Sequence, residues 1–179
     1  MKFKKFNFKK VLSTNNTAIK IIKKTNLNYG MVISEYQKKG RGQYGRKWIS
    51  IKGNLFVSFF FNLEKINISI KKLTKINCML VKKAISNFYK KKITFKSPND
   101  LLINGKKICG ILQESINKNN QRFLVVGIGI NVVKSPNIAH YPITNLYEVI
   151  GKKISYKLLL YSLKSNFENR FLNFFKKEI

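Results

Sequence analysis

Three stretches of the chain carry apolar residues at the three- and four-residue spacing of an amphipathic helix. The first begins after Ser13, a good N-cap residue, and runs to about residue 24. The second extends over residues 70–88 and the third over residues 155–177. The pattern therefore predicts a helix near the start of the chain, a long helix in the middle and another long helix at the end.

Short apolar runs between these helices predict strands. The run at 54–62 is continuous and rich in aromatic residues, which is typical of a buried strand. Two hairpins are indicated, one turning at Asn104 and Gly105 and one at residues 117–120. The predicted strands are 31–37, 54–62, 93–96, 101–103, one that begins at Lys107, and 122–132. Because hairpins make neighbouring strands antiparallel, we expect an α+β fold with a mainly antiparallel or mixed central sheet and helices packed on one face.

The length and composition fit one globular domain. The chain has 179 residues, 44% of them hydrophobic, and shows neither internal repeats nor linkers rich in Gly, Ser or Pro. No apolar run approaches the ~20 residues that cross a bilayer, and the N-terminus lacks the features of a secretory signal. Cys78 and Cys109 lack the number and spacing of a disulfide framework or a metal site, so we interpret both as reduced and buried. We expect a cytoplasmic protein with no membrane partner.

The formal net charge of +29 suggests nucleic-acid binding as one hypothesis. Arginine is the preferred residue for bidentate contacts with phosphates and bases, yet only four of the 36 basic residues are arginine. Lysine is spread along the whole chain, together with abundant Asn, Ile and Phe, all of which have A/T-rich codons. We therefore interpret the charge as base bias of the genome and expect no DNA partner, with a basic nucleic-acid-binding protein as the alternative.

Residues 40–46 form a basic, glycine-rich segment without helical or strand periodicity. Its three glycines let the backbone approach a ligand closely, and Arg41 and Arg46 supply charge for a phosphate or carboxylate. The spacing matches neither the P-loop nor the dinucleotide-binding fingerprint. From spacing alone, an anion-binding loop and a flexible basic surface loop are equally supported.

Two later segments also carry candidate chemistry. A lysine that faces inward from a strand, as Lys107 could, is costly to bury unless an anion meets it, and Gly110 would leave room for that approach. An exposed strand lysine is the commoner alternative. In residues 125–132, alternate glycines indicate that another backbone or a flat ligand packs on the strand, with Asn131 offering an amide. The alternative there is a crowded sheet interior.

Taken in chain order, several sequence blocks resemble the biotin–protein ligase family, which is related to the lipoate ligases and the class II aminoacyl-tRNA synthetases. The blocks are Ser13-Thr14-Asn15, Glu35-Tyr36-Gln37 running into GRGQYGRKW, KSPNDLLINGKKICGILQES and VVGIGINV, with a weaker PITNL block at residues 142–146. The resemblance implies that ATP and biotin form biotinyl-5′-AMP and that biotin then passes to a lysine of the biotin carboxyl carrier protein of acetyl-CoA carboxylase. We expect a single catalytic domain over residues 1–179, with no N-terminal DNA-binding domain and, as a departure from the family, without the small C-terminal β-barrel that usually follows. A lipoate–protein ligase of the same fold is the nearest alternative.

The resemblance also assigns roles to residues of this chain. The biotin-binding residues that it implies are Ser13, Thr14, Asn15, Gln37, Gly40, Arg41, Gly42, Lys107, Gly110 and Ile111. The nucleotide-binding residues that it implies are Gln43, Arg46, Trp48, Asn99, Asp100 and Asn131. Lys107 and Arg41 would be catalytic by neutralising charge as the carboxylate approaches the phosphate. Mg²⁺ would accompany the nucleotide, and no protein metal site is expected.

Two residues depart from the family pattern. Gln43 stands where many members carry Arg, so its contact with the bound adenylate is expected to be weaker. Ser97 replaces the usual Trp before Pro98, which loosens local packing.

Overall fold

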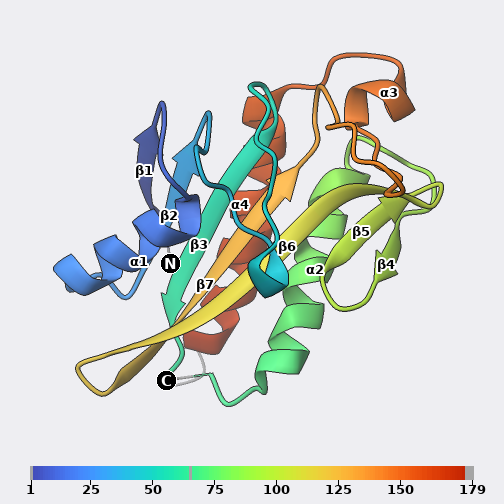
Figure 1. Cartoon of the computed structure of the whole chain (residues 1–179). Coiled ribbons are helices and arrows are strands. Elements are labelled where there is room, and N and C mark those ends of the chain that lie inside the picture. The colour runs from blue at the N-terminus through green and yellow to red at the C-terminus, as the bar shows by residue number, and fades with distance from the viewer. Residues whose placement is uncertain (1, 65, 176–179) are drawn as a thin grey trace.

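A computed structural model describes residues 2–64 and 66–175, and in this part of the chain seven strands form one sheet in the order β1-β2-β3-β7-β6-β5-β4 (Figure 1). The strands are β1 Lys4–Phe8, β2 Tyr29–Ser34, β3 Leu55–Asn62, β4 Thr94–Lys96, β5 Asp100–Ile103, β6 Lys106–Lys118 and β7 Gln121–Ile130. The helices are α1 Thr14–Lys24, α2 Ile70–Ser86, α3 Leu146–Ile150 and α4 Tyr156–Phe175, with a short 3-10 turn η1 at Gln43–Gly45. Only β1 and β2 pair in parallel, so the expected α+β fold with a mixed sheet is confirmed.

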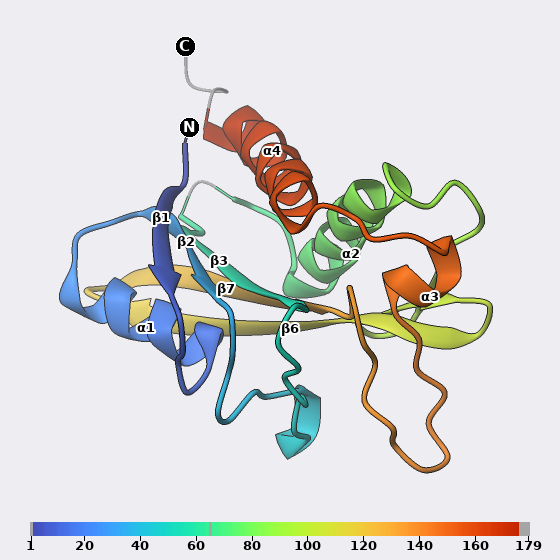
Figure 2. The same ribbon diagram turned by 90° about the horizontal axis from the view of Figure 1, so that it is seen from above.

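Helices cover both faces of the sheet, not one as the sequence led us to expect (Figure 2). On one face α2 and α4 enclose the larger core, where the ring of Phe59 stacks on Phe167 with centroids 4.2 Å apart. On the other face α1 packs Ala18 and Ile22 against Phe60 of β3. The correction has a physical reason in β3 itself. Every residue of this strand is buried, and a strand that is apolar on both sides needs a cover on each.

Both predicted hairpins are present. Asn104 and Gly105 have φ angles of 50° and 75°, the left-handed conformation that a tight two-residue turn requires, and they connect β5 to β6. Asn119 and Asn120, with φ of 48° and 61°, connect β6 to β7, whose pairing continues to Cys109 and Ile130. The hairpins thus build the half of the sheet on which most of the candidate chemistry lies.

Two elements were not expected from the sequence, namely β1 and α3. The side chains of β1 are mostly exposed, so its alternation of Lys and Phe gave no buried-strand pattern. Helix α3 has only five residues, and the side chain of Asn145 caps it by accepting a hydrogen bond from the Glu148 amide at 2.9 Å. The strand expected at 31–37 is shifted to Tyr29–Ser34. The expected end of the last helix, at residues 176–177, lies outside the described residues.

Both cysteines are free and buried, as expected. Burial, with a smaller contribution from Asp100, raises the pKa of the Cys78 thiol to about 12, so this side chain stays protonated and unreactive. None of the described helices is both long and apolar enough to span a membrane.

Candidate active site

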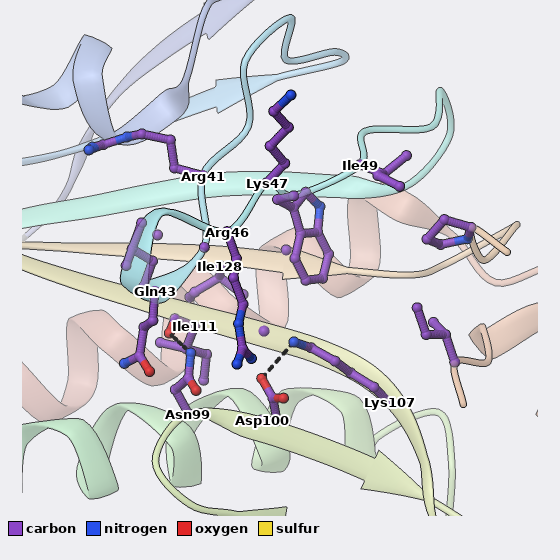
Figure 3. Close-up of a pocket in the computed structure, with 18 of the residues that line it drawn as sticks. Arg41, Gln43, Arg46, Lys47, Ile49, Asn99, Asp100, Lys107, Ile111 and Ile128 are labelled. Atoms are coloured by element: carbon purple, nitrogen blue, oxygen red, sulfur yellow. Dashed lines mark hydrogen bonds and ion pairs between the residues drawn. The ribbon is translucent and has the colours of Figure 1, made fainter. Parts of the chain in front are cut away.

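A cavity of about 810 Å³ opens on the sheet face that carries α1, beneath the glycine-rich loop and the segment 136–143 (Figure 3). Of the residues singled out by sequence, those that line it are Ser13, Thr14, Asn15, Gln37, Arg41, Gly42, Gln43, Arg46, Trp48, Asn99, Asp100, Lys107, Gly110, Ile111 and Asn131. Gly40 does not line the cavity. A Cβ on Gly40 would lie 2.5 Å from the Trp48 carbonyl oxygen, so this glycine packs the base of the loop.

One wall of the cavity is a buried polar network at the start of α1. Gln37 Oε1 accepts hydrogen bonds from the Thr14 amide at 2.8 Å and the Thr14 hydroxyl at 3.0 Å. Ser58 Oγ, from β3, lies 2.8 Å from Thr14 Oγ1 and 2.6 Å from Asn15 Oδ1. Ser58 was not anticipated, although a lone hydroxyl in the apolar run 54–62 was a signal of a polar contact inside the fold. The network holds these side chains in fixed orientations, which suits recognition of a small polar ring.

The floor of the cavity consists of glycines on paired strands. Gly110 of β6 lies opposite Gly129 of β7, and the indole of Trp48 covers both. A Cβ on Gly110 would lie 2.7 Å from the ring, and a Cβ on Gly129 would lie 2.5 Å from it. At Gly127 a Cβ would lie 2.2 Å from Asn15 Oδ1. The alternating glycines therefore leave room for flat groups, and here one of those groups is the chain's own tryptophan.

Lys107 faces the cavity because of an irregularity in β6. Residues three apart on a regular strand point to opposite faces, which would place Lys107 and Gly110 on opposite sides of the sheet. The register shifts between Leu101 and Leu102, so that Ile108 is an extra residue on β6. As a result the end of the Lys107 side chain lies 3.2 Å from where a Cβ on Gly110 would be. The inward lysine suggested by the sequence is present.

The ammonium of Lys107 meets a carboxylate in the cavity. Its Nζ lies 2.8 Å from Oδ1 of Asp100, and the hydroxyl of Tyr141 donates a hydrogen bond to Oδ2 of the same residue at 2.8 Å. Burial and this hydrogen bond raise the pKa of Tyr141 to about 12, so the phenol remains a neutral donor at pH 7. Tyr141 was missed by sequence reasoning, since a tyrosine in an irregular segment gives no periodic signal.

The glycine-rich loop is folded back over the cavity by its own backbone. The Gly42 amide donates to the Arg46 carbonyl at 2.6 Å, and the Trp48 amide donates to the Gly40 carbonyl at 3.0 Å. Figure 3 shows Gln43 and Arg46 pointing into the cavity and Arg41 pointing away from it. Arg41 instead forms an ion pair with Glu114 of β6, with 2.5 Å between Nη2 and Oε2. The loop residue whose charge approaches Lys107 is thus Arg46, and a catalytic role for Arg41 stays a prediction.

Two asparagines brace the cavity walls. Asn99 Nδ2 donates to the Ile111 carbonyl at 2.8 Å, which ties the turn before β5 to β6. Asn131 is 1% exposed, and its Nδ2 donates to the Thr144 carbonyl at 3.2 Å while its Oδ1 accepts from Asn54 at 3.4 Å. Both amides therefore position the walls. In the residues described here, no group of three or more His, Cys, Asp or Glu side chains is placed to hold a metal ion.

The sequence of the chain is similar to those of known ligases. The family model described as the biotin/lipoate A/B protein ligase family matches residues 8–131. The chain is 30% identical over 170 residues to the bifunctional ligase/repressor BirA of Bacillus subtilis, a match that covers 90% of this chain and 52% of that protein. It is 28% identical over 128 residues to the biotin–[acetyl-CoA-carboxylase] ligase of Paracoccus denitrificans, which covers 70% of this chain and 53% of that one. The chain therefore spans about half the length of the curated relatives it matches.

A solved structure gives the same picture in three dimensions. The biotin protein ligase from Aquifex aeolicus, in complex with biotin and ATP, superimposes with a TM-score of 0.81 at 31% sequence identity. The match covers 98% of this chain and 72% of that one. The seven-stranded sheet and its helices are therefore those of a known ligase fold.

Proposed function

The chain belongs to the biotin/lipoate A/B protein ligase family, and on that premise we propose that it forms biotinyl-5′-AMP from biotin and ATP and transfers biotin to a lysine of a carrier protein. The observation that carries the proposal is the convergence of three parts on one cavity. These are the polar network around Thr14 and Gln37, the inward Lys107 and the glycine-rich loop. A small polar ring, a carboxylate and a phosphate would each find a matching group there.

The reaction has two steps. In the first, a carboxylate oxygen of biotin attacks the α-phosphorus of ATP, a new P–O bond forms, and pyrophosphate leaves. In the second, the amine of a carrier lysine attacks the acyl carbon of the mixed anhydride, loses a proton, and AMP leaves as an amide bond forms. No protein nucleophile takes part, and His140, the chain's single histidine, is exposed at the edge of the cavity.

The chain's own groups act by orientation and electrostatics. Thr14, Asn15 and Gln37 would hold the ureido ring of biotin. Lys107 would leave Asp100 to bridge the biotin carboxylate and the α-phosphate, neutralising charge where two anions approach. Tyr141 would keep its hydrogen bond to Asp100 and so hold that carboxylate in place while the lysine moves.

Substrates and partner follow from the same premise. ATP would bind as its Mg²⁺ complex, because Mg²⁺ prefers phosphate oxygens and needs few protein carboxylates. The acceptor would be the biotin carboxyl carrier protein of acetyl-CoA carboxylase, by analogy with the Paracoccus relative. Use of ATP and of this acceptor agrees with the cytoplasmic location expected from the sequence.

The two alternatives are less well supported. A relative at 28% identity and a solved structure at 31% identity are named as biotin ligases, which favours biotin over lipoate. A nucleic-acid-binding protein on a decayed ligase fold would have no need of a buried network at Thr14 and Gln37 or of an ion pair inside a cavity. We therefore propose neither of them.

Biotin-dependent exchange of labelled pyrophosphate into ATP tests the function directly. The expected result is exchange that requires biotin and is not supported by lipoate. Exchange with lipoate in place of biotin would show the alternative ligase, and no exchange with either acid would refute the proposal.

Replacing Gln43 by Arg is expected to slow release of the adenylate. Gln43 points into the cavity, and its neutral amide makes a weaker bond to phosphate than a guanidinium does. The charged bond should contribute about 1 kcal/mol more, or roughly a fivefold slower release. Release can be followed by trapping biotinyl-5′-AMP after dilution, and labelling of added free lysine should fall in parallel. Unchanged release would mean that Arg46 already supplies the contact.

A further inference from the structure

Three cationic side chains meet around Tyr141 at the edge of the cavity. Nζ of Lys96 lies 5.7 Å from the centre of the Tyr141 ring, and Nζ of Lys107 lies 5.6 Å from it. Figure 3 shows the guanidinium of Arg46 directed to the same region, above Asp100. A phenol ring attracts cations through its electron-rich faces, so Tyr141 holds the two lysines near each other.

The charges in this cluster do not balance. Asp100 supplies one negative charge, and its two oxygens are already engaged by Lys107 and Tyr141. Within residues 2–64 and 66–175, no carboxylate forms an ion pair with Lys96 or Arg46. Like charges held close together are unfavourable unless an anion joins them. This part of the cavity therefore has the concentrated positive charge of a polyanion site. The lysines scattered over the surface are not clustered in this way.

Strand register sets the direction in which a ligand would lie. Gly129, Gly110, Asp100 and Lys96 are successive partners across β7, β6, β5 and β4, so they form a row on one face of the sheet. Two strand spacings separate Gly110 from Lys96, roughly 10 Å. Lys107 lies beside Gly110, and Lys96 is at the last strand of the sheet. A chain of phosphates laid along this row would run from Lys107 outward to Lys96.

We propose that Lys96, next to Arg46, binds the β- and γ-phosphates of ATP, the part that leaves as pyrophosphate, and that Tyr141 positions Lys96 for this contact. The proposal rests on the proposed ligase function and assigns different phosphates of ATP to different lysines. Lys107 serves the α-phosphate, which is present in both steps. Lys96 serves a group that is present only in the first.

That division gives a test in which the two half-reactions are measured separately. In Lys96→Gln the Michaelis constants for ATP and for pyrophosphate in the exchange reaction should rise roughly tenfold, less than for a buried electrostatic donor because Lys96 is exposed. Transfer of biotin from preformed biotinyl-5′-AMP to the carrier should keep its wild-type rate. Lys92→Gln, which removes an exposed lysine just before β4 that does not line the cavity, is the matched control and should change neither step.

Direct binding of inorganic pyrophosphate, measured by calorimetry, tests the role of Lys96 separately from the proposed ligase function. Wild-type protein should bind pyrophosphate about tenfold more tightly than Lys96→Gln does. Equal binding and equal exchange in the two proteins would overturn the proposal and leave the ligase function standing. An equal loss in both half-reactions would also overturn it, because Lys96 would then act on the adenylate or on the fold. Pyrophosphate binding that depends on Lys96 in a protein without any exchange activity would keep the anion site and refute the ligase function.

Discussion

Replacing Lys107 by Ala is expected to lower biotin-dependent pyrophosphate exchange by on the order of 10²–10³-fold, the cost of losing one donor aimed at developing charge. The side chain is 18% exposed, and it lies between the glycine floor and Asp100, where a carboxylate and a phosphate would meet. Biotin should still bind, since the network at Thr14, Gln37 and Ser58 is untouched. The measurement is the exchange rate at saturating substrates together with biotin affinity by calorimetry.

A second variant separates lost chemistry from a damaged fold. Removal of Lys107 leaves Asp100 buried without its cation, which costs stability in its own right. In the double variant Lys107→Ala with Asp100→Asn that unpaired charge is absent, so the free energy of unfolding should recover while exchange stays low. Recovery of exchange along with stability would contradict a direct role for Lys107.

Replacing Gly110 by Val is expected to weaken adenylate binding while the sheet remains folded. The φ of Gly110 is not in the left-handed region, and a β-branched residue suits a strand. The substitution therefore introduces no backbone strain. The added side chain would collide with Trp48 and crowd the end of Lys107. Overfilling of this kind costs about 1–3 kcal/mol, or roughly a fivefold to 150-fold loss of affinity when the cost falls on the bound state.

The chain's single tryptophan reports on this change. When the indole is displaced from the glycine floor, the emission of Trp48 should shift to longer wavelength, and the circular dichroism spectrum should stay that of the wild type. Ser115→Val, at an exposed position on the same strand, is the matched control and should alter neither emission nor binding. Wild-type affinity in Gly110→Val would show that ligands do not use this floor.

Sequence reasoning located about half of the cavity lining because the residues concerned lie in a few continuous segments of the chain. The segments around Gly42, Asp100 and Gly110 contain their own glycines, turns and charges, and each segment contributes part of the cavity lining. How the walls meet depends on long-range pairing. The bulge at Ile108 turns Lys107 toward the cavity. It depends on the register between two strands, which no local sequence pattern predicts.

The roles that were missed have the same origin. Tyr141 is far from Asp100 in sequence, and their hydrogen bond forms only because the segment 136–143 runs alongside Lys107, where the Lys107 amide donates to the Pro142 carbonyl at 2.9 Å. Arg41 was assigned by resemblance to the phosphate, whereas its pairing with Glu114 depends on where β6 passes the loop. Helix α1 covers the second face of the sheet for a reason already visible in β3, whose apolar run shows no alternation.

The position of β3 inside the sheet, between β2 and β7, has a consequence for folding on the ribosome. Its neighbour β7 is made much later in the chain, after all of α2 and the first hairpin. The apolar, aromatic segment Leu55–Asn62 is therefore synthesised well before β7, the strand with which it pairs on one side. Such segments are prone to pair with other chains, and contacts between residues distant in sequence form slowly. The hairpin of β6 and β7 can form by itself. We expect its completion to provide β3 with its second neighbouring strand and so to end the period in which the nascent chain is prone to aggregate.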